Sequence, residues 1–351
     1  MHPITFTRTR PILDDAGLAR LGAAWRGIED AADASPFQRW SWVGCRAAER
    51  YPDPVLAQAR RGAALLGLAL FNRRRGRLWL HESGTAALDS IYVEHNGPLA
   101  LPGPDREAVL AGLLRCALGD SLARLGGVAL SGVGGGVLAA AREVGGTAGH
   151  QARAAPFVDL AAIPAGTDYP SALSRNTRQQ LRRSARAYGP ARLDRAETAS
   201  QALDYLDALA ALHTASWQAR GKPGAFAQPA FLRFHRELAA HGAPSGEVDL
   251  MRITAGPMVV GYLYNMRAGG RVCSYQSGFD YAGAPPHGKP GLLCHHLAVE
   301  VARARGDTAY DFLAGDGRYK DSLANARGTL HWLRLVPRWH PRTLIEAVLG
   351  R

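Results

Sequence analysis

Two successive series of strand and helix patterns run along the 351-residue chain, and this repetition most limits the folds that it can adopt. Strands show as short apolar or alternating runs, and helices as apolar residues three or four positions apart. The first series predicts strands at 4–7, 55–60, 63–72, 77–81 and 128–130, and helices at 14–30, 35–49, 105–125 and up to 144. The second predicts strands at 157–160, 248–254, 258–267, 271–280, 309–313 and 329–336, and helices at 169–188, 199–220, 231–241, 292–305 and 318–324.

No low-complexity linker separates the two series, and the first ends near residue 150. The length of 351 residues fits two domains of about 100–200 residues each. We therefore predict an α/β (α+β) fold with domains at 1–154 and 155–351, each a mixed, mostly antiparallel sheet flanked by helices.

The charge balance predicts an anionic partner. The formal net charge is +12, from 42 basic and 30 acidic residues, and only Lys222, Lys289 and Lys320 are lysines. Such an excess suits nucleic acid, a phosphorylated cofactor or an acidic carrier protein.

The cysteines and the apolar runs indicate the cellular compartment of the protein. Four cysteines without paired spacing predict reduced thiols, and neither a disulfide framework nor a zinc ribbon. The first residues lack the apolar region of a signal peptide, and the longest uncharged run, 125–141, is interrupted by glycines. We expect a cytoplasmic protein that does not span a membrane.

Two glycine-rich turns precede predicted helices. Residues 134–139 read GGGVLA, formally a GxGxxA dinucleotide pattern, but no βαβ repeat surrounds them, which favours a plain strand-to-helix turn. Residues 287–291 read HGKPG, where two glycines, the Lys289 cation and a helix N-terminus would suit a pyrophosphate. An ordinary turn is the alternative there too.

Chemically active side chains gather after the strand predicted at 309–313. Asp311, Asp316, Tyr319 and Lys320 lie within ten residues, and a glycine stands on each side of Asp316. Acid, phenol and ammonium groups at a strand end can perform acid–base chemistry, or they can form a solvated turn.

An arginine stripe marks the helix predicted at 169–188. Its members fall on one face: Arg175, Arg178, Arg182, Arg183 and Arg186. The stripe could receive phosphates of a cofactor or nucleic acid, or it could be a solvated face. No aromatic residues interleave with it, which disfavours a platform for single-stranded nucleic acid.

Two further clusters carry polar groups. Cys294, His295 and His296 are consecutive on a predicted helix and point in different directions, so we expect core packing or surface positions rather than metal binding. Glu94, His95 and Asn96 follow a short apolar run, where they could face a substrate or form a turn.

The order of several motifs in the second half resembles the CelD-like group of the GNAT acyltransferase superfamily, which is related to the FemAB peptidyltransferases. The resemblance covers roughly residues 155–335, and the first half resembles the degenerate GNAT-like domain of such proteins. It rests on Leu212-His213, Trp217 to Gly221, Tyr275 to Asp280, Lys289-Pro290-Gly291, Asp311-Phe312-Leu313, Gly315-Asp316 and Tyr319-Lys320.

The resemblance implies transfer of an acyl group from a thioester to an amine, without a metal. The donor, acyl-CoA or an acyl carrier protein, would lie in the second domain and the acceptor in a cleft between the domains. The donor would be held by Gly288, Lys289, Pro290 and Gly291 together with Arg175, Arg178 and Arg182. The HGKPGL loop departs from the Arg/Gln-x-x-Gly-x-Gly/Ala pattern that is usual in GNAT enzymes.

The same resemblance assigns roles in a direct attack. Asp311 or Asp316, with Glu94 as a third candidate, would act as base, and Tyr319 would protonate the departing thiolate. Lys320 would orient Asp316 or bind a donor phosphate, and backbone N–H groups of the preceding strand would hold the oxyanion. Substrate contacts are expected at His95, Asn96, Trp217, Arg220, Tyr264, Tyr275 and Gln276.

Two other functions stay open at this point. A Fem-like transferase would use aminoacyl-tRNA as donor, and a non-catalytic protein would bind nucleic acid through the arginine stripe. The main hypothesis expects a small-molecule or saccharide amine as acceptor, an acidic acyl carrier protein as a further partner, and neither membrane nor nucleic acid.

Overall fold

The computed structural model describes residues 2–120, 126–315 and 317–340, which form two compact units. Unit 1 contains the residues up to Arg153 together with the segment from Thr329 onward, and unit 2 is Ala154–Gly328. The prediction places residues 329–336 in the second domain, and this is wrong, because they pack with unit 1.

The sheet of unit 1 has the strand order β1-β2-β3-β4-β6-β13. Neighbours are antiparallel except β4 and β6, which are parallel. Its strands are β1 (Ile4–Thr9), β2 (Pro54–Arg61), β3 (Ala64–Arg74), β4 (Arg77–Leu80), β6 (Val128–Val133) and β13 (Ala326–Val336), with the short β5 (Leu99–Ala100) beside β3. β13 pairs with β6 far away in sequence, which no local pattern predicts.

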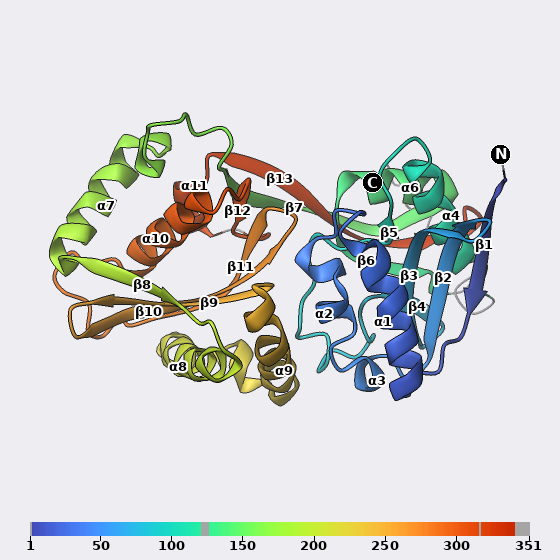
Figure 1. The fold of residues 1–351 in the computed structure, drawn as a ribbon, viewed down its shortest axis with the longest axis horizontal. Helices are drawn as coiled ribbons and strands as arrows, with labels where there is room; N and C mark the ends of the chain where they lie inside the picture. The colour runs from blue at the N-terminus through green and yellow to red at the C-terminus, as the bar shows by residue number, and fades with distance from the viewer. Residues whose placement is uncertain (1, 121–125, 316, 341–351) are drawn as a thin grey trace. The chain divides into compact units, whose positions relative to one another are not determined.

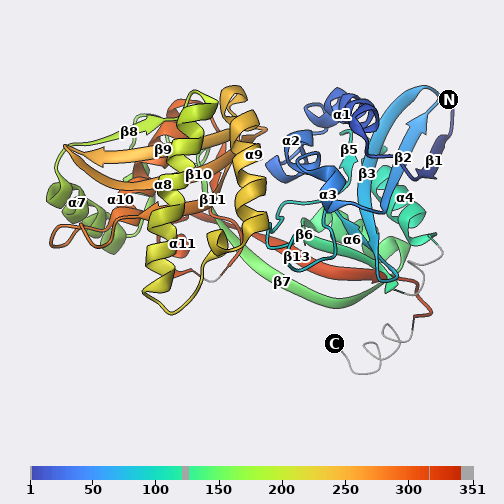
Figure 2. The same cartoon turned by 90° about the horizontal axis from the view of Figure 1, so that it is seen from below.

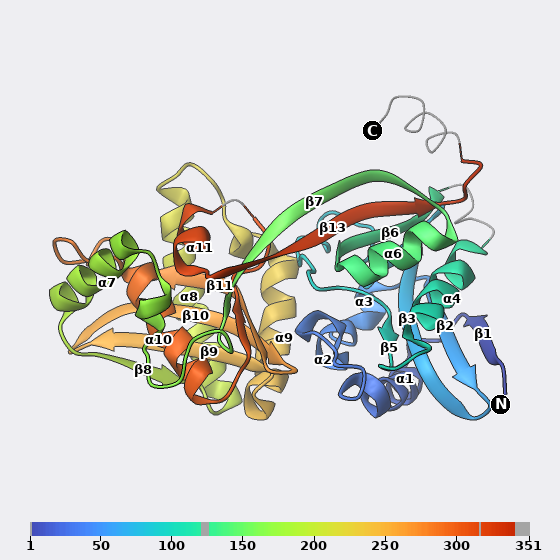
Figure 3. The ribbon, with the colours of Figure 1, turned by 90° about the horizontal axis from the view of Figure 1, so that it is seen from above.

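Helices cover both faces of the unit 1 sheet, with α4 and α6 opposite α1 (Figure 3). The helices are α1 (Asp15–Glu29), α2 (Trp40–Val43), α3 (Ala47–Arg50), α4 (Arg106–Leu118) and α6 (Gly135–Val144), with the 3₁₀ turn η1 (Pro36–Gln38). The single helix predicted at 35–49 is broken twice, because Arg39 is extended between η1 and α2 and Arg46 adopts a left-handed φ of 50° between α2 and α3. The helix predicted to residue 125 ends at Leu118, and residues 121–125 lie outside the described part.

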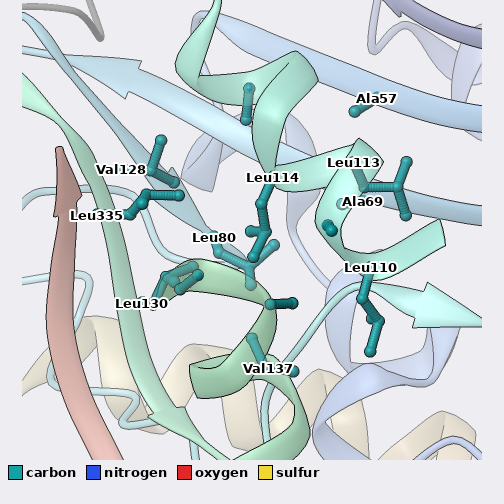
Figure 4. Packing of buried hydrophobic residues seen from close by; sticks show 14 of the residues in the cluster. Ala57, Ala69, Leu80, Leu110, Leu113, Leu114, Val128, Leu130, Val137 and Leu335 are labelled. Carbon is teal, nitrogen blue, oxygen red and sulfur yellow. The ribbon is translucent and has the colours of Figure 1, made fainter. Parts of the chain in front are cut away.

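The core of unit 1 lies between the sheet and α4 and α6 (Figure 4). Leu110, Leu113 and Leu114 of α4 pack there with strand residues. Leu333 and Leu335 of β13 join the same cluster, so the last described strand is part of the unit 1 core. Burial of such side chains contributes about 1.5–3 kcal/mol each.

Unit 2 repeats the same strand plan, in the order β8-β9-β10-β11-β12-β7. Its neighbours are antiparallel except β11 and β12, which are parallel. The strands are β7 (Gly146–Asp159), β8 (Ala191–Arg195), β9 (Val248–Ala255), β10 (Met258–Ala268), β11 (Arg271–Phe279) and β12 (Ala309–Asp311). Strands β7 and β13 each have residues in both units.

Two helix pairs enclose the unit 2 sheet. α8 (Ala199–Gln218) and α9 (Pro229–Ser245) cover one face (Figure 2), and α10 (Pro290–Ala304) and α7 (Arg175–Tyr188) lie on the other (Figure 1). The short elements are η2 (Tyr169–Ala172), η3 (Ala225–Ala227) and α11 (Arg318–Leu323). Capping fits the sequence: the Ser174 hydroxyl accepts from Thr177 N at the start of α7, and Gly189 ends that helix with a φ of 75°.

Each unit is thus a mixed, mostly antiparallel sheet flanked by helices, which confirms the predicted fold class. No helix within the described ranges is long and apolar enough to cross a membrane.

Candidate functional site

In unit 2 the parallel strands β11 and β12 pair over a short stretch only. β11 pairs with β12 only from Arg271 to Cys273, and it then continues to Phe279. Just beyond this point the register against β10 shifts between Tyr264 and Asn265, which marks a bulge in the ladder. Bulges reorient backbone groups and are frequent beside active sites.

A hydrogen-bonded chain lies next to this divergence. The Tyr310 hydroxyl donates to Asn265 Oδ1 at 3.3 Å, so it accepts from His295 Nδ1 at 3.2 Å. This direction assigns the imidazole proton to Nδ1 and leaves Nε2 with a lone pair. Burial, and secondarily the Lys320 charge, lower the pKa of His295 to about 3, which keeps the ring neutral.

Tyr319 stacks on the other side of His295. Their ring centroids are 5.9 Å apart at an interplanar angle of 17°, and the Tyr319 side chain stays 52% exposed. Partial burial, and then Tyr281, raise the pKa of Tyr319 to about 12. Tyr319 therefore presents a protonated phenol to solvent while its ring is held on a buried imidazole.

Two other predicted catalytic groups have structural partners. The Asp311 carboxylate, 1% exposed, pairs with Arg271 Nη1 at 2.7 Å and accepts from Leu313 N at 2.7 Å. The predicted role as base is not supported, because a buried, paired carboxylate is a weak proton acceptor. Lys320 Nζ donates to the carbonyls of Leu313 and Ala314, at 3.1 and 2.8 Å, so its ammonium group is bound to the backbone that follows β12. Asp316 lies outside the described residues.

The predicted HGKPG loop stands before α10 and is anchored to α7. Lys289 N donates to Ser184 Oγ at 2.9 Å, and Lys289 Nζ donates to Gln180 Oε1 at 2.7 Å. No side chain caps α10, so its first N–H groups have no partner within the helix. Pro290 occupies the first turn, where it costs no hydrogen bond.

The loop glycines serve internal packing. A Cβ at Gly291 would lie 3.1 Å from the Phe279 ring, and one at Gly288 would lie 2.8 Å from the Pro285 carbonyl. Packing therefore accounts for both glycines, and close approach of a ligand to this backbone stays a prediction. The anion-binding potential of this place rests on the uncapped helix and on Lys289.

The predicted arginine stripe is confirmed as one face of α7 for four of its five members and is wrong for Arg183. Arg175, Arg178, Arg182 and Arg186 line a shared groove, whereas Arg183 turns away and its Nη2 lies 2.7 Å from His287 Nε2. The three arginines predicted to bind the donor, Arg175, Arg178 and Arg182, thus lie on a different side of α7 from the residues that contact the HGKPG loop.

The predicted substrate residues of unit 2 divide into core and surface. The Tyr264 hydroxyl lies 2.9 Å from His235 Nδ1, and the Tyr275 ring packs on His235 and Phe231, all inside the core. Their predicted substrate contact is wrong, because neighbouring aromatic rings enclose them.

The remaining predicted residues of unit 2 are more accessible. Gln276 and Trp217 are half-buried, and Trp217 contacts the His213 ring at 5.6 Å between centroids. Arg220 is exposed and places its guanidinium 5.9 Å from the centroid of the Tyr281 ring. Contact with a substrate stays a prediction for these three residues.

The predicted residues of unit 1 lie in a packed polar segment. Asn96 is buried, with Oδ1 at 2.7 Å from His81 Nδ1 and Nδ2 donating to Leu80 O at 3.1 Å. Its predicted contact with substrate is therefore wrong, because these groups occupy its amide. Glu94 is buried, and His95 is half-buried with a left-handed φ of 46°. The GGGVLA motif forms the turn into α6, with Gly134 at the N-cap.

Comparisons with known proteins agree with this geometry. Residues 172–321 match the family described as Acetyltransferase (GNAT) domain. Unit 2 contains a GNAT domain. The chain is therefore a GNAT-type transferase enzyme, and the repeated strand order makes unit 1 a second GNAT-like fold.

Solved structures extend the likeness over nearly the whole chain. FemX is 9% identical with a TM-score of 0.60, over 98% of this chain and 100% of its own. The C-terminal DUF2156 domain of a protein described as a lysylphosphatidylglycerol synthetase, from Agrobacterium fabrum, is 13% identical with a TM-score of 0.57, over 95% and 96%. L-PGS from Bacillus licheniformis is 12% identical with a TM-score of 0.50, over 82% and 87%. At these identities the likeness shows the fold, and no curated protein matches.

The GNAT domain also holds residues that sequence reasoning missed. His295, Tyr310 and Asn265 form its buried hydrogen-bonded chain, yet they come from three separate elements. The Tyr188 hydroxyl, at the end of α7, is buried without a hydrogen-bond partner among the described residues. Burial, followed by Cys294, Asp280 and Tyr281, raises the pKa of Tyr188 to about 12.

Residues 2–120, 126–315 and 317–340 contain no set of ligands for a metal ion. No group of three or more His, Cys, Asp or Glu side chains in these ranges could hold an ion. All four cysteines are free thiols.

Proposed function

We propose that this enzyme transfers an acyl group from a thioester, acyl-CoA or an acyl carrier protein, to an amine of a small molecule or saccharide by direct attack. The observation that carries the proposal is Tyr319, a protonated and half-exposed phenol stacked on His295 where β11 leaves β12.

The N-terminus of α10 suits the phosphates of the donor. Its first N–H groups are uncapped, the helix dipole favours an anion there, and Lys289 adds a cation beside them. Ser184 and Gln180 of α7 hold this loop through Lys289. The thioester would then lie along the unpaired part of β11, where backbone N–H groups beside the bulge can stabilise an oxyanion.

Proton transfer completes the proposed reaction. The amine loses a proton to a carboxylate, for which Asp316 and Glu94 remain the candidates. As the tetrahedral intermediate collapses, the carbon–sulfur bond breaks and Tyr319 gives its proton to the thiolate. His295 holds the phenol ring in place and is a positioning residue.

A second candidate uses aminoacyl-tRNA as donor. It is favoured by the fold likeness to FemX and to a protein described as a lysylphosphatidylglycerol synthetase, whose name implies transfer of a lysyl group. The two candidates share the fold and differ in the donor.

Native mass spectrometry of the full chain with acyl-CoAs, acyl carrier proteins and charged tRNA separates them. We expect a one-to-one adduct with coenzyme A or a carrier protein, followed by acyl transfer to an amine in a panel of acceptors. Binding and turnover with charged tRNA alone would favour the second candidate, and turnover with none of these donors would overturn the proposed function.

A further inference from the structure

A groove of about 560 Å³ is lined by residues of α7 and η2 in unit 2. Figure 1 shows where α7 lies. The groove is lined by Asp168, Ser171, Arg175, Arg178, Gln179, Arg182 and Arg186. Its volume is within the range of about 300–1,000 Å³ that is typical of small-molecule sites, but its lining is charged rather than apolar. The ligand that fits this lining is therefore an anion.

The charges of the groove are strongly unbalanced. Four guanidinium groups face one carboxylate, and Asp168 already accepts from Ser171 N at 3.1 Å. Arg178 Nη1 donates to the carbonyls of Ser171 and Leu173, at 3.1 and 3.0 Å, so it fixes the wall of the groove.

The other three arginines are available to a ligand. The side chains of Arg175, Arg182 and Arg186 form no hydrogen bond or ion pair within the part of the chain that the structure describes. Like charges one turn apart on a helix repel each other. A bound anion would remove this repulsion.

The groove is separate from the α10 loop. At about 100° per residue, the four groove arginines fall within about 80° of one another around α7, and Ser184 lies nearly opposite them. Ser184 is the residue that holds Lys289 in the loop. An anion at the α10 N-terminus and an anion in the groove would therefore contact different faces of α7.

We propose that this groove binds a ligand that carries two or more linked phosphate groups, at a site separate from that of the acyl donor. From Arg175 to Arg186 the row extends about 16 Å along the helix, at about 1.5 Å per residue. A single phosphate engages one or two guanidinium forks, whereas a chain of phosphates can use the whole row. The open groove leaves room for the group that bears the chain.

Titration calorimetry of the full chain with tripolyphosphate tests this site directly. We expect saturable one-to-one binding that weakens with salt, and inorganic phosphate that binds about tenfold more weakly or less. Changing Arg182→Ala and Arg186→Ala together should lower the tripolyphosphate affinity by about tenfold or more, because two free guanidinium groups are lost. The matched control is Arg183→Ala on the same helix, whose loss should change this affinity by less than about twofold, since it faces away.

Further titrations distinguish between the possible ligands that carry phosphate. Saturating coenzyme A should leave tripolyphosphate affinity unchanged, and competition between them would overturn the claim of a separate site. Absence of tripolyphosphate binding would overturn the proposal, including the case where only RNA oligonucleotides or phosphatidylglycerol vesicles bind. The titration measures binding and needs no turnover. Its result therefore does not depend on whether the proposed acyl transfer occurs.

Discussion

Units 1 and 2 have the same strand order and the same pairing sense, yet they treat one position differently. In each unit a parallel pair, β4–β6 or β11–β12, starts together and then separates. In unit 1 the chain itself fills the place beside β6. Asn96 forms a parallel bridge with Val133, and its N–H donates to Gly132 O at 3.0 Å.

The polar groups at these two positions also differ in availability. In unit 1 the Asn96 side chain bonds to His81 and to Leu80 O, and Ser131 Oγ donates to Glu82 Oε2 at 2.6 Å. In unit 2 the hydrogen-bonded chain ends at an imidazole whose Nε2 keeps its lone pair, under a half-exposed phenol. The same strand order therefore supports a closed polar network in one unit and a half-exposed phenol stacked on a buried imidazole in the other.

Replacing Tyr319 tests the active side of this comparison and has the largest expected effect. Tyr319→Phe removes the proton donor but keeps the stacked ring, so kcat should fall by about 10²–10⁴ with KM nearly unchanged. Steady-state kinetics measure this, with Tyr205→Phe, on α8, as the control for a lost phenol elsewhere in unit 2. Turnover within about threefold of the wild type, less than acid–base catalysis contributes, would make Tyr319 structural and direct attention to Glu94 and His95.

Replacing Asn96 tests the closed side. Asn96→Ala leaves His81 Nδ1, Leu80 O and Gly97 N without their partner, so unit 1 should lose about 3 kcal/mol of stability, at about 1–3 kcal/mol for an unsatisfied buried group. Denaturant unfolding measures the loss, and coenzyme A affinity should stay the same. A weaker affinity for coenzyme A in a folded variant would show that unit 1 takes part in donor binding.

The last expected effect concerns how the stability of unit 1 depends on pH. Burial, and then Asp89, raise the pKa of Glu82 from 4.5 to about 7, and its side chain is 9% exposed. The folded state therefore binds more protons than the unfolded state between pH 4.5 and about 7, so stability falls as the pH rises through this window.

Glu82→Gln removes this titration, so the stability of unit 1 should change by about 3 kcal/mol less between pH 4.5 and 8 than in the wild type. Thermal unfolding at several pH values measures the difference, with the exposed Glu107→Gln on α4 as the matched control. Parallel stability curves for Glu82→Gln and the wild type would contradict it.

Local periodicity predicts most elements of both units, and long-range pairing limits the rest. The helical spacing of the arginines predicts the groove face of α7 correctly for every member except Arg183, because a solvated helix surface depends on that spacing. β13 is predicted as a strand but not as part of unit 1, since its partner β6 comes much earlier in the chain, before all of unit 2. β8 is missed, because its residues are exposed or half-buried and lack an apolar alternation.

The candidate site is less accessible to sequence reasoning than the fold. Tyr319 can be selected from its place after a strand and between glycines. His295 cannot be separated from an ordinary core histidine, since its importance depends on Tyr310, Asn265 and Tyr319 meeting it in space. The same reason explains the wrong prediction for Tyr264, whose buried neighbours come from distant elements.

The pairing of β13 with β6 has a consequence for synthesis on the ribosome. Leu333 and Leu335 belong to the apolar core of unit 1, so the emerging N-terminal half lacks one strand of its sheet until all of unit 2 has left the exit tunnel. During that interval the free edge of β6 exposes unpaired backbone groups, which are a common starting point for aggregation. Ribosome stalling or a premature stop before residue 329 would therefore leave unit 1 open and dependent on chaperones, however intact its own first 153 residues are.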